Sequence, residues 1–177
     1  MLRQRLTIIT EQSPVNEHPV LIKQLRTPIE HSIVVLESGI SIDQYTCAVF
    51  AFHLAGDPTY VDIASFGLGK IFAGKEFIAF LLSNNFLVLR EAEEISQGDL
   101  VIYFENGDFC HVGRIASTKR IVSKWGAGWL YEHGLWEVPN SYGHEVRYYV
   151  GPDQDTSFDL FLKYAESKGF NFTKPIS

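Results

Sequence analysis

The chain has 177 residues, of which 46% are hydrophobic and 14% aromatic, and its formal net charge is −6. This length and composition predict a globular protein with a sizeable core. The negative charge argues against a general nucleic-acid binder, which gathers Lys and Arg on one face. Two cysteines, Cys47 and Cys110, are too few for a disulfide-stapled secreted scaffold.

We expect a single domain over residues 1–177, made of an N-terminal segment 1–40, a core at about 41–150 and a C-terminal helix over 155–169. No apolar run has the length of a signal peptide or of a membrane span. The sequence therefore predicts a cytoplasmic protein without a membrane partner, and a cleaved export signal stays open.

The first 40 residues predict two short strands, at 5–10 and 31–37, because both are rich in β-branched and aliphatic residues. A short helix is expected between them at 20–25. Three prolines make the rest of this segment irregular.

A helix is predicted over 46–55, where Thr46 serves as N-cap and Gly56 closes the last turn. A second helix is expected over 75–83, with its phenylalanines on one side. A strand over 86–90 follows it.

The rest of the core predicts antiparallel strands. They are expected over 100–105, 109–116, 120–125 and 145–150. Asn106-Gly107 is a strong hairpin signal between the first two. A three-residue turn at 117–119 is expected to form the second hairpin, and 126–142 reads as a Gly- and aromatic-rich loop.

Cys47 and His111 are the residues with the most chemical potential. Cys47 begins the predicted helix, where unpaired backbone N–H groups and the helix dipole favour a thiolate. A nearby imidazole is a second common way to activate a thiol. The plain alternatives are a buried structural cysteine and a buried structural histidine.

The motifs around these residues resemble the NlpC/P60 and CHAP branch of the papain-like superfamily. They are Gly98-Asp99-Leu100-Val101, His111-Val112-Gly113, Tyr45-Thr46-Cys47 through Ala51, and Ser123-Lys124-Trp125-Gly126. The resemblance implies an α+β papain-like fold, with Cys47 as nucleophile on a helix and His111 as base on an antiparallel sheet. The branch's usual Asp-Cys-Ser signature is replaced here by Thr46-Cys47-Ala48, which bears on the cell-wall peptidase substrate more than on the mechanism.

A third residue is expected to orient the imidazole. With a three-residue turn, Ser123 lies diagonally from His111 on one sheet face, and Gly113 leaves space between them. A two-residue turn reverses the parity and brings Lys124 to that face instead. We favour Ser123, because a cation beside the histidine opposes its protonation.

The oxyanion and substrate contacts are expected from the backbone N–H of Cys47 together with Gln44 or Tyr45. Either side chain equally suits a plain residue at a helix start. Trp125 begins an aromatic loop that lines a substrate groove or, equally, packs as a lid over the sheet.

These residues together predict a thiol-dependent hydrolase or acyltransferase that acts on an amide or peptide-type bond. Its partner is a peptide or amide substrate, and no cofactor is expected. The histidines lack zinc-type spacing, so no metal is expected either. The alternative is a catalytically silent domain of the same fold that serves as a binding or interaction module. The oligomeric state and the exact acyl substrate stay open.

Overall fold

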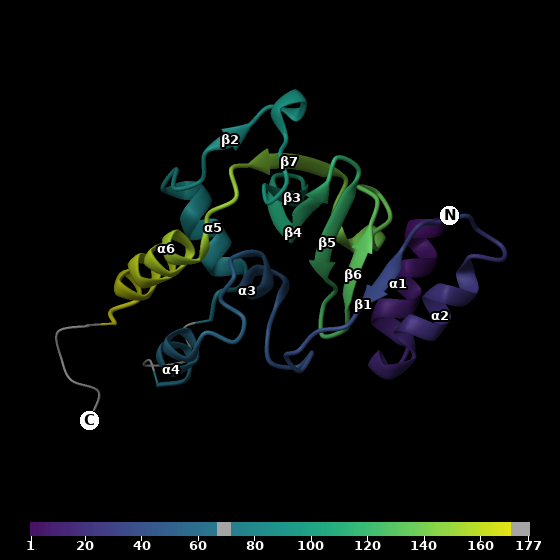
Figure 1. Ribbon diagram of the computed structural model, residues 1–177, viewed down its shortest axis with the longest axis horizontal. Coiled ribbons are helices and arrows are strands. Elements are labelled where there is room, and N and C mark those ends of the chain that lie inside the picture. Colours follow the sequence, from purple (N-terminus) through teal and green to yellow (C-terminus); the bar gives the residue numbers. More distant parts are fainter. Residues whose placement is uncertain (67–71, 171–177) are drawn as a thin grey trace.

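The computed structural model describes residues 1–66 and 72–170, which form an α+β structure around one seven-stranded antiparallel sheet (Figure 1). The strand order is β1-β6-β5-β4-β3-β7-β2. The strands are β1 (Val34–Leu36), β2 (Leu89–Arg90), β3 (Leu100–Glu105), β4 (Asp108–Ser117), β5 (Arg120–Lys124), β6 (Leu130–His133) and β7 (Glu145–Tyr149). The α-helices are α1 (Leu2–Gln12), α2 (His18–Leu25), α3 (Cys47–Ala51), α4 (Pro58–Phe66), α5 (Lys75–Ser83) and α6 (Gln154–Ser167). Three short 3-10 helices are η1 (Val15–Glu17), η2 (Ala92–Glu94) and η3 (Asn140–Tyr142).

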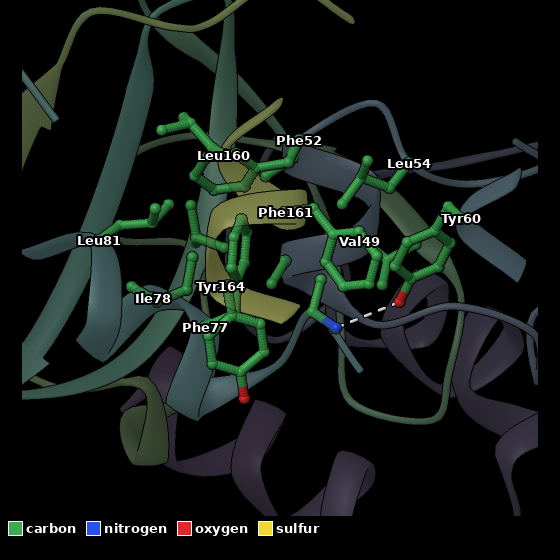
Figure 2. Close-up of a cluster of buried hydrophobic side chains, with 14 of the residues drawn as sticks. Val49, Phe52, Leu54, Tyr60, Phe77, Ile78, Leu81, Leu160, Phe161 and Tyr164 are labelled. Atoms are coloured by element: carbon green, nitrogen blue, oxygen red, sulfur yellow. Dashed lines mark hydrogen bonds between the residues drawn. The ribbon is translucent and has the colours of Figure 1, made fainter. Parts of the chain in front are cut away.

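The helices α3 to α6 bury their apolar residues against one face of the sheet (Figure 2). Aromatic rings dominate this cluster, with Phe52 edge-on to Phe77 at 5.1 Å and Tyr60 edge-on to Phe161 at 4.7 Å between ring centroids. Edge-to-face contacts of this kind stabilise a core beyond the area that they bury. The Tyr60 hydroxyl also accepts the backbone N–H of Ala73, which holds the chain before α5 against α4.

The opposite face of the sheet packs on α1 and α2. Leu6 and Ile9 of α1 and Ile22 of α2 meet Val101 and Tyr103 of β3 in a second buried cluster. Alternation along β3 divides its side chains between the two clusters, because successive residues of a strand point to opposite faces. The strand is buried on both sides and reads as a continuous apolar run.

The predicted strand at 5–10 is wrong, because these residues belong to α1. Leu2, Leu6 and Ile9 recur at helical spacing and form the stripe that packs on the sheet. Tertiary burial of that stripe outweighs the strand preference of the β-branched residues between them. The neighbouring predictions are closer: α2 contains the expected helix at 20–25, and β1 lies within the expected strand at 31–37.

The helix that begins at Cys47 is shorter than predicted and ends at Ala51. The chain turns at His53, which takes a left-handed φ of 54°. The unpredicted helix α4 then begins at Pro58, where a proline fits because a first-turn N–H needs no partner. The later helix α5 has the predicted bounds of 75–83.

The hairpin between β3 and β4 forms as predicted at Asn106-Gly107, whose φ angles of 52° and 84° are those of a tight primed turn. The three-residue turn predicted at 117–119 is wrong: Ser117 pairs with Arg120 across a two-residue turn. An irregularity between Ile115 and Ser117 inserts one extra residue into β4 and restores the parity.

The structure differs from two further predictions. The expected loop at 126–142 contains β6, which pairs with β5 on one side and β1 on the other. Only Leu89–Arg90 of the strand expected at 86–90 is in the sheet. Within the described ranges, no helix combines the length and the apolar character that crossing a bilayer requires.

Candidate active site

Cys47 is the first residue of α3, and Thr46 caps the helix. The Thr46 hydroxyl oxygen accepts the Val49 backbone N–H at 3.2 Å, and the hydroxyl donates to the Ala73 carbonyl at 3.0 Å. These two bonds fix the start of the helix. Because α3 packs against β4 and β5, Cys47 lies where the helix meets the strands that carry His111 and Ser123.

The thiol of Cys47 has a raised pKa. Burial is the main cause, and it outweighs the backbone N–H groups of Val112 and Ala48 and the charge of Lys124, all of which lower the pKa. The sequence led us to expect a lowered pKa at the helix start. The helix does supply favourable N–H groups, but the cost of placing a thiolate in a buried site is larger.

His111 lies on β4 opposite Tyr103 and is almost fully buried. Its ring stacks on Tyr142 at 4.0 Å with an interplanar angle of 20°. Burial, and then the neighbouring His133, hold the pKa of His111 well below its usual value of 6.5. The imidazole is therefore neutral at neutral pH.

His111 pairs with Tyr103 and points to the face of the sheet that packs on α1 and α2, whereas Cys47 packs with the cluster on the other face. No hydrogen bond joins their side chains in the described part of the chain. The backbone N–H close to the thiol belongs to Val112, the residue after His111. Tyr142 stacks on the imidazole, and its own pKa is raised by burial and then by the charge of Cys47. Nε2 of His111 is enclosed and has no hydrogen-bond partner among the described residues.

Ser123 shares a sheet face with His111, as expected. A Cβ added at Gly113 would come within 2.9 Å of the Ser123 Cβ, so the missing side chain of Gly113 does leave room beside Ser123. The serine is, however, hydrogen-bonded to another histidine: its Oγ lies 2.8 Å from Nε2 of His133. Trp125 donates its indole N–H to the same oxygen at 3.1 Å.

The partners around His133 fix the direction of this hydrogen-bond chain. Nδ1 of His133 lies 2.8 Å from the Gly134 carbonyl, which only accepts, so Nδ1 carries the proton. Nε2 is then an acceptor, and the Ser123 hydroxyl must donate to it. The single hydroxyl proton of Ser123 is thus committed to His133, and Ser123 has none left for His111.

Lys124 points to the other face of the sheet, because it follows Ser123 in a strand. Its side chain is completely buried, and Nζ donates to the carbonyls of Gly126 and Gly128 at 2.9 Å each. The ammonium lies 5.1 Å from the centroid of the Tyr45 ring. The arrangement in which Lys124 sits on the face of His111 is therefore not the one adopted.

The three residues expected at the oxyanion or substrate site have different environments. Gln44 is exposed and lines a cavity of about 820 Å³. Tyr45 lines the same cavity but is buried, and its hydroxyl donates to Ser38. Trp125 is fully buried with its ring 4.4 Å from that of Tyr131, so it forms part of the core and does not face a groove. The alternative of an aromatic lid packed over the sheet describes Trp125 better.

The cavity adjoins the start of α3 and has a mainly apolar wall. Its volume falls in the range of about 300–1,000 Å³ that small-molecule sites occupy. Its apolar lining includes Val49, Leu54 and Tyr60, and its polar lining near Cys47 includes Gln44 and Thr46. Thr46, the residue before Cys47, is part of the cavity wall, whereas Cys47 itself does not line the cavity.

From the sequence, Tyr142 had no assigned role, and His133 was placed only in the aromatic loop that lines a substrate groove or packs as a lid over the sheet. Both lie within the stretch that was expected to be a loop, so neither could be placed on a sheet face. The signal that was available is the spacing of Tyr131, Glu132 and His133, because Tyr131 and His133 are buried two residues apart in β6 and Glu132 between them is only partly buried. In residues 1–66 and 72–170, no group of three or more His, Cys, Asp or Glu side chains is placed to hold a metal ion.

Comparison of the chain with protein-family models, curated proteins and solved structures found no match.

Proposed function

We propose that the protein is a thiol-dependent hydrolase or acyltransferase of papain-like fold that acts on an amide or peptide-type bond, with Cys47 as nucleophile and His111 as base. The observation that carries this proposal is the position of the thiol. It lies at the capped start of α3 and close to the N–H of Val112, the residue that follows His111 in β4. Nucleophile and base then come from a helix and a strand that pack on each other.

The resting pair in this proposal is a neutral thiol and a neutral imidazole. Burial raises the pKa of the Cys47 thiol and lowers the pKa of His111, so both shifts disfavour the ionised pair. His111 in its neutral form is a proton acceptor. We therefore propose that the thiol loses its proton to His111 during attack, when the substrate carbonyl is in place.

The chemistry follows from these roles. The Cys47 sulfur forms a bond to the acyl carbon while its proton passes to His111. The bond from the acyl carbon to the leaving nitrogen breaks, and the leaving amine takes the proton from His111. Water, or another nucleophile in a transfer reaction, then bonds to the acyl carbon while its proton passes to His111. The carbon–sulfur bond breaks, the acyl product leaves, and His111 returns that proton to the Cys47 sulfur.

Acylation with p-nitrophenyl acetate, a generic acyl donor, tests the proposal. Mass spectrometry of the intact and digested protein should find one acetyl group on Cys47. Cys110 is a matched control, because it is the other free cysteine and lies in a strand. Cys110→Ser should be acylated like the wild type, whereas Cys47→Ser should not be acylated at sulfur.

His111→Ala should slow the acylation by at least about 100-fold, because general-base catalysis typically contributes that much. Acylation that persists in Cys47→Ser, or that is absent from the wild type, would contradict the proposal.

One observation favours a second candidate function, a silent binding module. Cys47 and His111 share no hydrogen bond among the described residues, and the mainly apolar cavity at the start of α3 is lined by neither of them. A binding module needs the cavity and not the thiol. Cys47→Ala would then retain any ligand that the wild type binds, and neither protein would turn it over.

A further inference from the structure

Lys124 is held in place by more contacts than a surface lysine would have. Its side chain is completely buried, and its ammonium donates to two carbonyls of one turn, Gly126 and Gly128. The Tyr45 ring faces the same ammonium at 5.1 Å. A buried charge is costly unless it is paired or hydrogen-bonded, and these contacts offset part of the cost of burying the ammonium.

The ammonium has one donor to spare. An ammonium carries three N–H groups, and the two carbonyls use two of them. No carboxylate forms an ion pair with Lys124 in the part of the chain that the structure describes. The helix α3, which begins at Cys47, packs against β5 on the face to which Lys124 points, and Tyr45, whose ring faces the ammonium, is two residues before Cys47. The negative groups that act on Lys124 are a Cys47 thiolate and, to a smaller extent, Asp43. Asp43 is exposed and hydrogen-bonded to Ser41.

Three titratable side chains belong to elements that surround Cys47. Lys124 comes from β5, His111 from β4 and Tyr142 from η3. Of these, His111 is neutral, since burial and His133 depress its pKa, and burial raises the pKa of Tyr142. Lys124 is thus the group of the three that carries a positive charge at neutral pH, although burial lowers its pKa as well.

We propose that Lys124 is the fixed cation that stabilises the Cys47 thiolate, a role that an imidazolium would otherwise fill. This inference rests on the proposed nucleophilic role of Cys47. Lys124 stays protonated throughout and accepts no proton. It holds a positive charge in place for the thiolate, and His111 carries out the proton transfer. The strand alternation that separates Lys124 from Ser123 also keeps the ammonium on the face away from the imidazole.

The pH dependence of Cys47 alkylation by iodoacetamide tests this, in a Cys110→Ser background with one thiol. Lys124→Met removes the charge but keeps a long side chain. It should raise the apparent pKa of Cys47 by about one unit or more, which slows alkylation about tenfold at a pH below both values. Lys124→Arg keeps the charge and should restore at least part of the shift. His111→Ala should leave the pKa of Cys47 nearly unchanged.

An unchanged pKa of Cys47 in Lys124→Met would overturn the inference. A shift of the Cys47 pKa in Lys124→Arg as large as in Lys124→Met would also overturn it, because only the fit of the side chain would then matter. A second measurement does not require Lys124 to be replaced. Coupling between two groups is reciprocal, so Cys47→Ala should lower the pKa of the Lys124 ammonium, followed by NMR of ¹³C-labelled lysine. Identical Lys124 titrations in Cys47→Ala and wild type would refute the coupling even if Lys124→Met failed to fold.

These outcomes separate the inference from the proposed function. Alkylation by iodoacetamide needs no substrate turnover. If acylation of Cys47 by p-nitrophenyl acetate fails while Lys124→Met still raises the thiol pKa, the hydrolase proposal is wrong and the charge coupling stands. If acylation of Cys47 succeeds while Lys124→Met leaves the thiol pKa unchanged, the charge coupling is wrong and the hydrolase proposal stands.

Discussion

Gly113 shows how one missing side chain shapes the candidate site. A Cβ at this position would lie 2.8 Å from Ile121 Cγ2 and 2.9 Å from Ser123 Cβ, closer than such atoms approach. The third near atom is the Val122 carbonyl oxygen, which belongs to the backbone and cannot move away cheaply. The close approach of β4 and β5 beside Ser123 thus depends on glycine.

Gly113→Ala should therefore lower the free energy of unfolding by about 1–3 kcal/mol, the usual cost of overpacking. Urea unfolding measures it. Gly39→Ala is the control, because no atom lies within 4 Å of its added Cβ and stability should hardly change. Equal stabilities of the two variants would mean that β4 and β5 separate easily at this point.

Thr46 makes two hydrogen bonds at the start of α3, one as N-cap and one to the chain before α5. Thr46→Val keeps the shape and loses both bonds. We expect a loss of about 1–2 kcal/mol in the free energy of unfolding, the upper part of the range for N-cap replacement.

Thr156→Val is the matched control for Thr46→Val. Thr156 is exposed in the first turn of α6, and it is its backbone N–H that bonds to the Asp153 cap. Its replacement should change stability by less than about 0.5 kcal/mol. A Thr46→Val protein as stable as this control would show that α3 does not depend on its cap.

At the scale of elements, Arg114 joins three segments that are far apart in sequence. Its guanidinium donates to the carbonyls of Ala51 at the end of α3, Gly98 before β3 and Pro152 before α6. Arginine suits this role because its donors point outward in a fixed planar fork. The contact with Ala51 sets the end of α3 on β4 while Cys47 occupies the other end.

Arg114→Met should lower the free energy of unfolding by about 2–4 kcal/mol, because three carbonyls lose their donors. Arg114→Lys should fall between this variant and the wild type, since an ammonium cannot reach all three directions. Arg5→Met serves as control, because Arg5 is exposed on α1. Thermal or urea unfolding gives the ranking, and an Arg114→Met protein that matches Arg5→Met would contradict it.

The sequence predicted correctly those elements whose local residue preferences favour the same structure as their burial in the fold. The β3–β4 hairpin was predictable because Asn106-Gly107 tolerates the positive φ angles that its turn needs. The α1 helix was not, because its β-branched residues favour a strand locally and its apolar stripe gains from α2 and the sheet only after folding. Likewise β6 is a strand because it pairs with β1 on one side and β5 on the other, and its own residues do not predict these pairings.

For the candidate residues, the sheet face of a side chain was easier to predict than its hydrogen-bond partners. Register arguments placed Ser123 on the face of His111, although the turn was wrong and the irregularity at Ala116 restored the parity. The hydrogen-bond partner of Ser123 is His133, a residue of β6. The register of the β4–β5 hairpin alone could not predict this partner. The raised pKa of Cys47 depends on burial, which sequence spacing does not report.

At the scale of the whole molecule, two buried neutral histidines couple stability to pH. Burial lowers the pKa of His133 to about 4, and the pKa of His111 is also well below 6.5. In the unfolded chain both titrate near 6.5. Their contribution to stability is therefore fully present above pH 6.5 and is lost as the pH falls from 6.5 toward the folded pKa, because the unfolded state binds the protons first.

The free energy of unfolding should accordingly fall between pH 6.5 and pH 4.5. His133→Gln should reduce the slope by about one proton, or about 1.4 kcal/mol per pH unit. Urea unfolding at a series of pH values measures both slopes. If the two slopes are equal over this range, His133 is protonated in the folded state or is exposed to solvent.

The pairing of β1 with β6 and of β2 with β7 also sets the order in which the chain can assemble. The strands β3, β4, β5 and β6 lie side by side in sequence order, so this meander closes only short loops and should form early (Figure 1). The first forty residues, by contrast, find their strand partner only after β6 has left the ribosome. Until the sheet forms, the apolar stripe of α1 has nothing to cover it and β1 has no strand to pair with. Pulsed hydrogen exchange during refolding should accordingly protect the amides of β3 to β5 before those of α1 and β1.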